Sequence, residues 1–201
     1  MIVHFFKPLL LICLFVLPLW IIVRTVIAAI NNKNTGSLVN AKKELLLVFF
    51  IIYITSVLSL TLAPASLTHF NNPHQLRLNY IPFVNIYNDL CYMFKISYYE
   101  VTEIVLENLL GNILLFIPMG FFIPLLFPTY GSIKKILIIC VLFSFLIELT
   151  QFLMYWYGTN RTADIDDIIL NTLGGFLGFV IYRKFFKNLQ AKFELYKNIK
   201  N

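Results

Sequence analysis

The chain has 201 residues, of which 59% are hydrophobic and only 13% are charged. Soluble domains carry about 25% charged residues, so this composition excludes an ordinary soluble domain and makes the lipid bilayer the expected solvent. The net charge of +6 comes mainly from short loops and the C-terminal tail, which is typical of membrane topology and does not predict nucleic-acid binding.

Five apolar segments approach or exceed the roughly 20 residues that a helix needs to cross the hydrocarbon core. They are Phe5–Ile30, Leu45–Leu62, Val105–Phe127, Ile133–Met154 and Ile165–Phe186. The sequence therefore predicts an all-α membrane protein, a bundle of about five transmembrane helices with one long aromatic extracytoplasmic loop. Its expected parts are a first helix with a basic cytoplasmic link (1–44), a transmembrane domain (45–186) and a basic cytoplasmic tail (187–201).

Basic residues set the expected orientation, because cytoplasmic loops carry an excess of Lys and Arg. They occur between the first two segments (Lys33, Lys42, Lys43), between the third and fourth (Lys134, Lys135), and in the tail. These regions alternate correctly, so we expect the N-terminus outside and the C-terminus in the cytoplasm. The alternative, a cleaved signal peptide in the first segment, is disfavoured by its long apolar run and by Arg24.

The loop between the second and third segments, Pro64–Val101, is too aromatic to lie free in water. Phe83, Tyr87, Leu90 and Phe94 recur in it at helical spacing. This pattern predicts a short amphipathic helix on the outer membrane surface.

Polar residues recur on one face of each of the last two segments. Glu148 and Gln151 share a face of the fourth, and Asp164, Asp167 and Asn171 share a face of the fifth. At 1.5 Å per residue, Glu148 and Asn171 both lie roughly 10 Å inside the outer boundary. The third segment also begins on the outer side, so the polar groups of three helices are expected at one depth.

An ionised carboxylate alone in lipid costs several kcal/mol. We therefore expect these groups to turn toward one another and toward Arg161, which would form a polar cavity open to the outer face. The predicted ligand-binding residues are Glu148, Gln151, Arg161, Asp164, Asp167, Asn171, Asn108, Asn112 and Arg77.

Structural roles compete with this interpretation. Asp164, Asp166 and Asp167 begin a helix, where carboxylates favour the helix dipole. Asp166 points away from the shared face, so it is predicted to act only as a cap. Gly174 and Gly178 form a G-x-x-x-G pattern on the face of Asp167, which predicts close packing against the third or fourth helix.

Few catalytic options exist. The sequence has no nucleophile elbow, no phosphate loop and no H-E-x-x-H motif, and its three cysteines lack metal-binding spacing. A cluster of Glu148, Asp164 and Asp167 would offer oxygen ligands for Mg²⁺ or Ca²⁺, or acid–base chemistry. Neither signal is specific, so no cofactor is predicted and a binding protein is favoured over an enzyme.

Three ordered motifs resemble the VanZ-like family of bacterial membrane proteins. They are NILLFIPMGF (112–121), LIELTQF (146–152) and RTADIDDIILNTLGGFLGF (161–179), and RLNYIPF (77–83) is similar to a further family element. The resemblance covers about 75–182, and it implies a multi-pass protein of the bacterial cytoplasmic membrane. The family is named for a member associated with resistance to teicoplanin, a glycopeptide antibiotic with a lipid tail.

The resulting functional hypothesis is a cell-envelope protein with a polar outer-leaflet pocket. It would bind an amphiphile, namely a lipid-linked wall precursor, a lipoglycopeptide-type antibiotic or a lipid, and contribute to glycopeptide resistance. The expected partners are this ligand and membrane lipids. The alternatives are an acid-dependent, metal-assisted enzyme that modifies an envelope lipid, and a structural bundle with no ligand.

Overall fold

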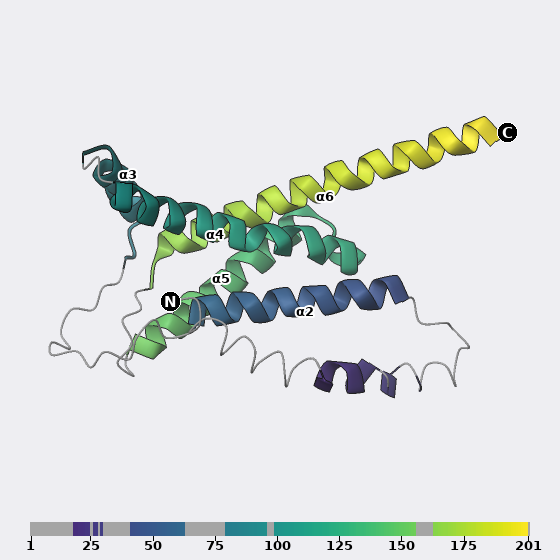
Figure 1. The fold of residues 1–201 in the computed structure, drawn as a ribbon, viewed down its shortest axis with the longest axis horizontal. Helices are drawn as coiled ribbons and strands as arrows, with labels where there is room; N and C mark the ends of the chain where they lie inside the picture. The colour runs from purple at the N-terminus through teal and green to yellow at the C-terminus, as the bar shows by residue number, and fades with distance from the viewer. Residues whose placement is uncertain are drawn as a thin grey trace. The chain divides into compact units, whose positions relative to one another are not determined.

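The computed structural model describes residues 18–24, 26–27, 29, 41–62, 79–95, 99–155 and 163–200 (Figure 1). The chain divides into two compact units, Met1–Ala63 and Pro64–Asn201, which we describe separately. Regular structure in the described residues is helical, apart from one short bridge that belongs to the candidate site.

The first unit contains helix α2, Ala41–Leu62, whose apolar residues lie on all sides, as in helices surrounded by lipid. Its hydroxyl side chains are accommodated by local hydrogen bonds; Thr55, for example, donates to the carbonyl of Ile51 at 2.8 Å. Near the start of α2, Arg24 Nε donates to Glu44 Oε2 at 2.8 Å, which pairs the two charges.

Four helices are long and apolar enough to cross a membrane within the part of the chain that the structure describes. Their candidate spans are Lys43–Leu62, Thr102–Leu126, Ile133–Met154 and Ile165–Phe186. They match the last four predicted segments closely. Most of the predicted first segment, Phe5–Ile30, lies outside the described residues, although 18–24 within it are helical.

Two helices of the second unit extend beyond the predicted membrane segments. Helix α4, Tyr99–Leu126, begins before Val105, and helix α6, Ile165–Lys200, continues past Phe186 through the predicted tail. Hydropathy identifies only the apolar part of a helix, which lipid can surround, and does not mark where the helix itself ends. The sequence from 187 to 200 contains neither Gly nor Pro, so nothing in its helix propensity ends the helix at the predicted membrane boundary.

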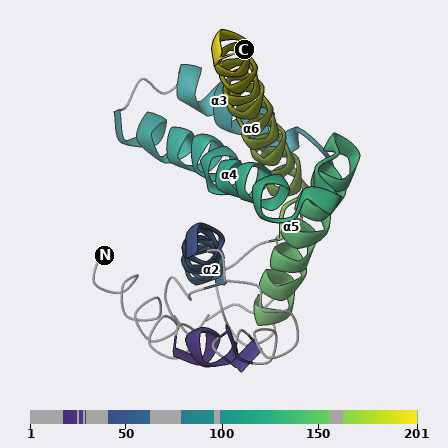
Figure 2. The same ribbon diagram turned by 90° about the vertical axis from the view of Figure 1, so that its right-hand side faces the viewer.

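Helices α4, α5 (Ile133–Tyr155) and α6 pack together in the second unit (Figures 1 and 2). The short 3-10 helix η1, Pro128–Tyr130, connects α4 to α5. The pairs of residues in contact show that α6 runs parallel to α4 and antiparallel to α5.

The closest approach in this unit is a seam between α4 and α6 that depends on glycine. A Cβ at Gly174 would lie 2.0 Å from the carbonyl oxygen of Ile113, and one at Gly178 would lie 2.0 Å from that of Ile117. Gly120 of α4 likewise faces the backbone of Gly175. The predicted G-x-x-x-G packing is therefore confirmed, and its partner is the third predicted span.

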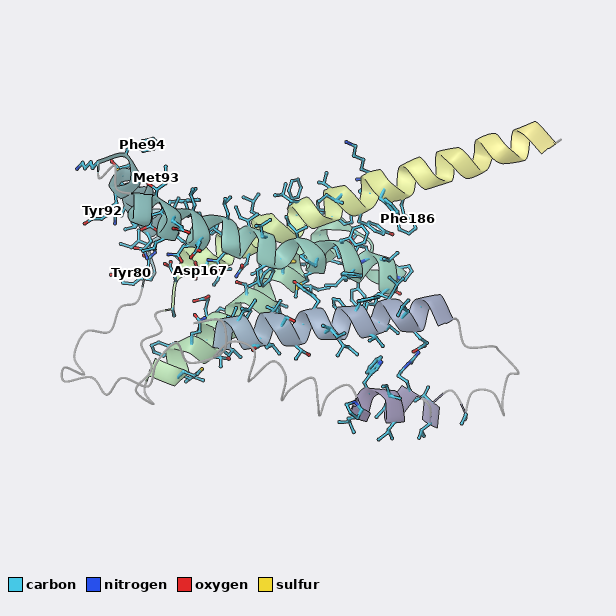
Figure 3. All side chains as sticks on the ribbon, viewed as in Figure 1. Tyr80, Tyr92, Met93, Phe94, Asp167 and Phe186 are labelled. Carbon is cyan, nitrogen blue, oxygen red and sulfur yellow. The ribbon has the colours of Figure 1, made fainter. Side chains whose placement is uncertain are left out.

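Helix α3, Val84–Lys95, lies beside the first turns of α4 (Figure 1). It confirms the short helix predicted from the aromatic spacing. Its apolar side chains are exposed: Tyr87 is 68% and Phe94 78% accessible. Figure 3 shows Tyr92, Met93 and Phe94 together at the far end of this helix.

Candidate functional site

The start of α6 meets the middle of α4 and the last turns of α5 in the second unit, in a region that we call the polar end. Asp167 of α6 contacts Asn112 of α4, and Asp164 contacts Glu148 of α5. Figure 3 shows Asp167 at this end, with Phe186 far along α6. Hydrophilic residues from three predicted spans thus lie at the same level of the bundle.

A short backbone bridge ties the loop before α3 to the residues that lead into α6. The amide of Asn79 donates to the carbonyl of Ala163 at 3.1 Å, and the amide of Ile165 donates to the carbonyl of Asn79 at 3.0 Å. Residues more than 80 positions apart are therefore held in register. This bridge fixes where the aromatic loop meets the membrane helices.

Asp166 caps helix α3, not its own helix. Its carboxylate accepts hydrogen bonds from the backbone amides of Phe83, Asn85 and Ile86, the last two at 3.0 and 3.1 Å. Amides in the first turn of a helix lack partners within that helix, and a carboxylate there also favours the helix dipole. Asp166 is only 2% exposed. Because its carboxylate bonds to the amides at the start of α3, the prediction that it caps only its own helix is wrong.

Phe83 immediately precedes α3 and has a φ of 67°, in the left-handed region. A large residue in that conformation costs roughly 1–3 kcal/mol unless its surroundings hold it there. The hydrogen bond from its amide to Asp166 offsets part of this cost. The aromatic loop and the start of α6 therefore stabilise each other.

Asp164 lies at the centre of a second set of hydrogen bonds. Its carboxylate accepts from the side-chain amides of Asn79 at 2.7 Å and Asn85 at 2.6 Å, and from the backbone amide of Asp166 at 2.8 Å. Its own backbone amide donates to Glu148 Oε2 at 2.8 Å. One acidic residue thus joins the loop, α5 and α6.

Two further bonds between helices lie deeper in the unit. Asn112 Nδ2 donates to Asp167 Oδ1 at 2.6 Å, and Asn171 Nδ2 donates to Ser144 Oγ at 2.8 Å. The amide oxygen of Asn171 is buried and has no hydrogen-bond partner among the described atoms. A buried acceptor of this kind can take a hydrogen bond from a donor outside the described residues.

Several acidic residues lie at the polar end. Its described acidic residues include Asp89 of α3, Glu148, Asp164, Asp166 and Asp167. Burial, and then the neighbouring charges of Asp164 and Asp166, raise the pKa of the Asp89 carboxyl above its ordinary value. The region is therefore electrostatically disposed toward cationic groups.

The structure brings together five of the nine residues predicted to bind a ligand and buries a sixth nearby. Asp164 bonds to Glu148, and Asn112 bonds to Asp167. Asn171 bonds to Ser144 of α5, and Gln151 is buried on α5. Asn108 is exposed. Arg77 and Arg161 lie outside the described residues.

Sequence reasoning missed Asn79, Asn85 and the true role of Asp166. Asn79 belongs to RLNYIPF, the motif element before the third span, which could have marked it. No local signal could reveal the role of Asp166, because its partners in the loop are about 80 residues away. Among the described residues no three His, Cys, Asp or Glu side chains are grouped so that they could hold a metal ion.

Four long apolar helices and polar contacts between helices define a multi-pass helical membrane protein. The VanZ/LLP1 family model matches residues 50–187, so the chain belongs to the VanZ/LLP1 family. Protein VanZ from Enterococcus faecium is 30% identical over 121 residues, which are 60% of this chain and 62% of that protein's length. No solved structure matches this chain significantly. The family resemblance of the sequence motifs is thereby confirmed.

Proposed function

We propose that this protein binds an amphiphile that enters from the outer leaflet of the bacterial cytoplasmic membrane, and that binding contributes to resistance against lipid-tailed glycopeptides. The observation that carries the proposal is the position of Glu148. It lies within a candidate span yet is only 5% exposed. An ionisable group there is expensive to maintain, and such groups usually mark functional sites in membrane proteins.

The family relationship supplies the class of ligand. VanZ is linked to resistance against teicoplanin, whose lipid tail distinguishes it from simpler glycopeptides. The orientation predicted from the basic residues places the polar end at the outer face, where such a molecule and its wall-precursor targets meet the membrane. A lipid-linked wall precursor and a membrane lipid share the same amphiphilic chemistry.

The polar end suggests a role for each group. Glu148, Asp164 and Asp167 would attract a cationic or hydrogen-bond-donating head group. Gln151 and Asn171 would orient it, and the unpartnered amide oxygen of Asn171 is suited to accept its hydrogen bond. Arg161 or Arg77 would contact a phosphate, if the ligand carries one. The exposed aromatic residues of α3 would contact its apolar parts.

The test replaces the chromosomal copy by Glu148→Gln at matched membrane abundance. We expect the variant to lose protection against teicoplanin as completely as a deletion, while susceptibility to a glycopeptide without a lipid tail stays unchanged. Glu44→Gln, which alters an acid of the first unit, is the matched control. Full protection by Glu148→Gln at normal abundance would refute the proposal.

A purely structural role is the second candidate, and the hydrogen bonds favour it. Asp164 and Asp167 are paired with Asn79, Asn85 and Asn112 within the protein. On this view Glu148→Gln and Asp167→Asn lower abundance or melting temperature, and the protein that remains protects normally. Protection divided by membrane abundance separates the two candidates.

A further inference from the structure

The large apolar side chains of helix α3 lie on its outer side. Tyr87, Leu90 and Phe94 are all exposed, and no residue of the helix is buried. Because they are spaced by three and four residues, these positions form one continuous row along the helix, which we call the aromatic stripe. A contiguous exposed row of this kind marks a surface that meets lipid or another apolar partner.

The polar residues of α3 face the protein instead. Asn85 and Asp89, four positions apart, lie on the side of the helix opposite the aromatic stripe. Asn85 Nδ2 donates to Asp164 Oδ2 at 2.6 Å, and Asp89 is half-buried beside Asp164 and Asp166. A helix on the surface of a soluble protein has the reverse arrangement, with its apolar side toward the protein. This inversion indicates an apolar medium on the outer side of α3.

Helix α3 is attached where α6 enters the membrane. Asp166, whose carboxylate caps α3, is the second residue of the candidate span Ile165–Phe186. The bridge between Asn79 and Asp164 fixes the preceding loop at the same level, and α3 contacts both α4 and α6. The start of α3 therefore lies at the membrane boundary, next to the surface that these two helices present to lipid.

The residue types of α3 suit the boundary between lipid head groups and acyl chains. Tyrosine is enriched there because its ring is apolar and its hydroxyl is polar, and Leu90 and Phe94 are wholly apolar. Lys95, in the last turn, has a side chain long enough to extend its ammonium toward lipid phosphates. An amphipathic helix in this position buries its apolar side roughly 5–10 Å into the interface. The 12 residues of α3 cover about 18 Å at 1.5 Å per residue, so the stripe can contact several lipids.

We propose that the aromatic stripe of α3 lies in the lipid leaflet on the side of the polar end, at the boundary between head groups and acyl chains, and that this seating holds residues 79–95 against α6. The basic residues predict this leaflet to be the outer one. The occupant of the stripe is phospholipid, the same solvent that surrounds the candidate spans. The inference does not depend on the proposed function. It adds that an amphiphile dissolved in this leaflet lies beside α3 before its head group reaches the buried residues.

The test measures which side of α3 lies in lipid, with the full-length protein in phosphatidylcholine vesicles. The two native tryptophans, Trp20 and Trp156, are replaced by phenylalanine, and Phe94→Trp or Tyr92→Trp then supplies a single fluorescent probe. Tyr92 is the matched control, because it is exposed at the same end of α3 (Figure 3). Helical geometry places it on the side of Asn85, opposite the stripe.

Phosphatidylcholine with brominated acyl chains should quench Phe94→Trp about threefold more strongly than Tyr92→Trp, because opposite sides of a helix are about 10 Å apart. Aqueous iodide should show the opposite preference, and Tyr87→Trp, a second probe of the stripe, should behave like Phe94→Trp. Equal quenching of Phe94→Trp and Tyr92→Trp by brominated lipid would overturn the proposal. Protection of Phe94→Trp from both quenchers would also overturn it, because a second copy or another protein would then cover the stripe.

Hydrogen exchange tests whether lipid seating supports the loop. Tyr87→Glu should accelerate the exchange of residues 79–95 in vesicles by about tenfold. Asn88→Glu, at an exposed position off the stripe, is the control for the added charge and should leave the exchange unchanged. Equal exchange in the two variants would show that the stripe does not hold the loop. The proposed function fails separately, through unchanged protection by Glu148→Gln.

Discussion

Two regions of the second unit hold the same helices by opposite means. One is the seam between α4 and α6, and the other is the polar end. At the seam, glycine backbones approach the carbonyls of Ile113 and Ile117 because side chains are missing. At the polar end, Asp164 and Asp166 hold the loop through hydrogen bonds that only particular side chains can make. Lipid provides no hydrophobic force between helices, so close packing and polar contacts must supply the association.

The two regions should respond differently to mutation. The seam excludes any added atom, whereas the polar end depends on the acceptor atoms of Asp164 and Asp166. Substitutions at the seam should therefore act on the whole unit. Substitutions at the polar end should act first on α3 and the loop.

The largest loss of stability is expected from a substitution at the seam. Gly174→Ala places a Cβ 2.0 Å from the carbonyl oxygen of Ile113, so α4 and α6 must separate, at a cost of about 3 kcal/mol. The melting temperature in detergent should fall clearly. Gly111→Ala is the matched control, because its Cβ meets open space and alanine favours the helix by up to about 1 kcal/mol. Equal effects of the two substitutions would show that the seam does not depend on glycine.

Removal of the α3 cap should rank second. Asp166→Ala leaves the amides of Phe83, Asn85 and Ile86 without their acceptor, and loss of a charged hydrogen-bonding group costs about 3 kcal/mol. Hydrogen exchange of residues 79–95 should accelerate by roughly 100-fold, while exchange in α5 stays constant. Asp166→Asn keeps one acceptor oxygen and should give a smaller effect. Uniform acceleration throughout the unit would contradict a local role.

Substitutions in the buried pair of Ser144 and Asn171 should lower the stability less than removal of the α3 cap does. Ser144→Ala removes the acceptor of the Asn171 side-chain amide, and polar pairs between membrane helices contribute about 1 kcal/mol. Adding Asn171→Leu removes the unpaired amide as well, so the double variant should recover part of the lost stability. Thermal unfolding of the four proteins measures the coupling. Strict additivity would show that the two side chains do not interact.

The smallest change in stability is expected from substitution of Asp89, and this change depends on pH. Because its pKa is raised in the folded protein, the stabilisation from protonated Asp89 is complete below the ordinary Asp pKa of about 3.9. It is lost as pH rises through the raised value. Asp89→Asn should therefore raise the melting temperature slightly at pH 7 and leave it unchanged near pH 3. A decrease at pH 7 would mean that Asp89 has a favourable partner.

Local patterns predicted much of the architecture. The last four apolar segments became helices, and the spacing of Phe83, Tyr87, Leu90 and Phe94 predicted α3. The spacing of Gly174 and Gly178 predicted a close helix contact. These features succeeded because helical period and the length needed to cross a bilayer are properties of the chain itself. The predicted span Ile165–Phe186 is confirmed, and α6 continues beyond it to Lys200, because hydropathy marks the membrane segment and not the end of the helix.

What the sequence by itself determined is which segments can cross a membrane and which of their faces carry polar groups, since both follow from local composition and helical geometry. Only the tertiary structure decided that Asp166 caps another helix and that the amide of Asn171 meets Ser144. Each of these depends on the rotation and approach of helices far apart in the chain. The packing of glycine against backbone sets that approach, and no single segment encodes it.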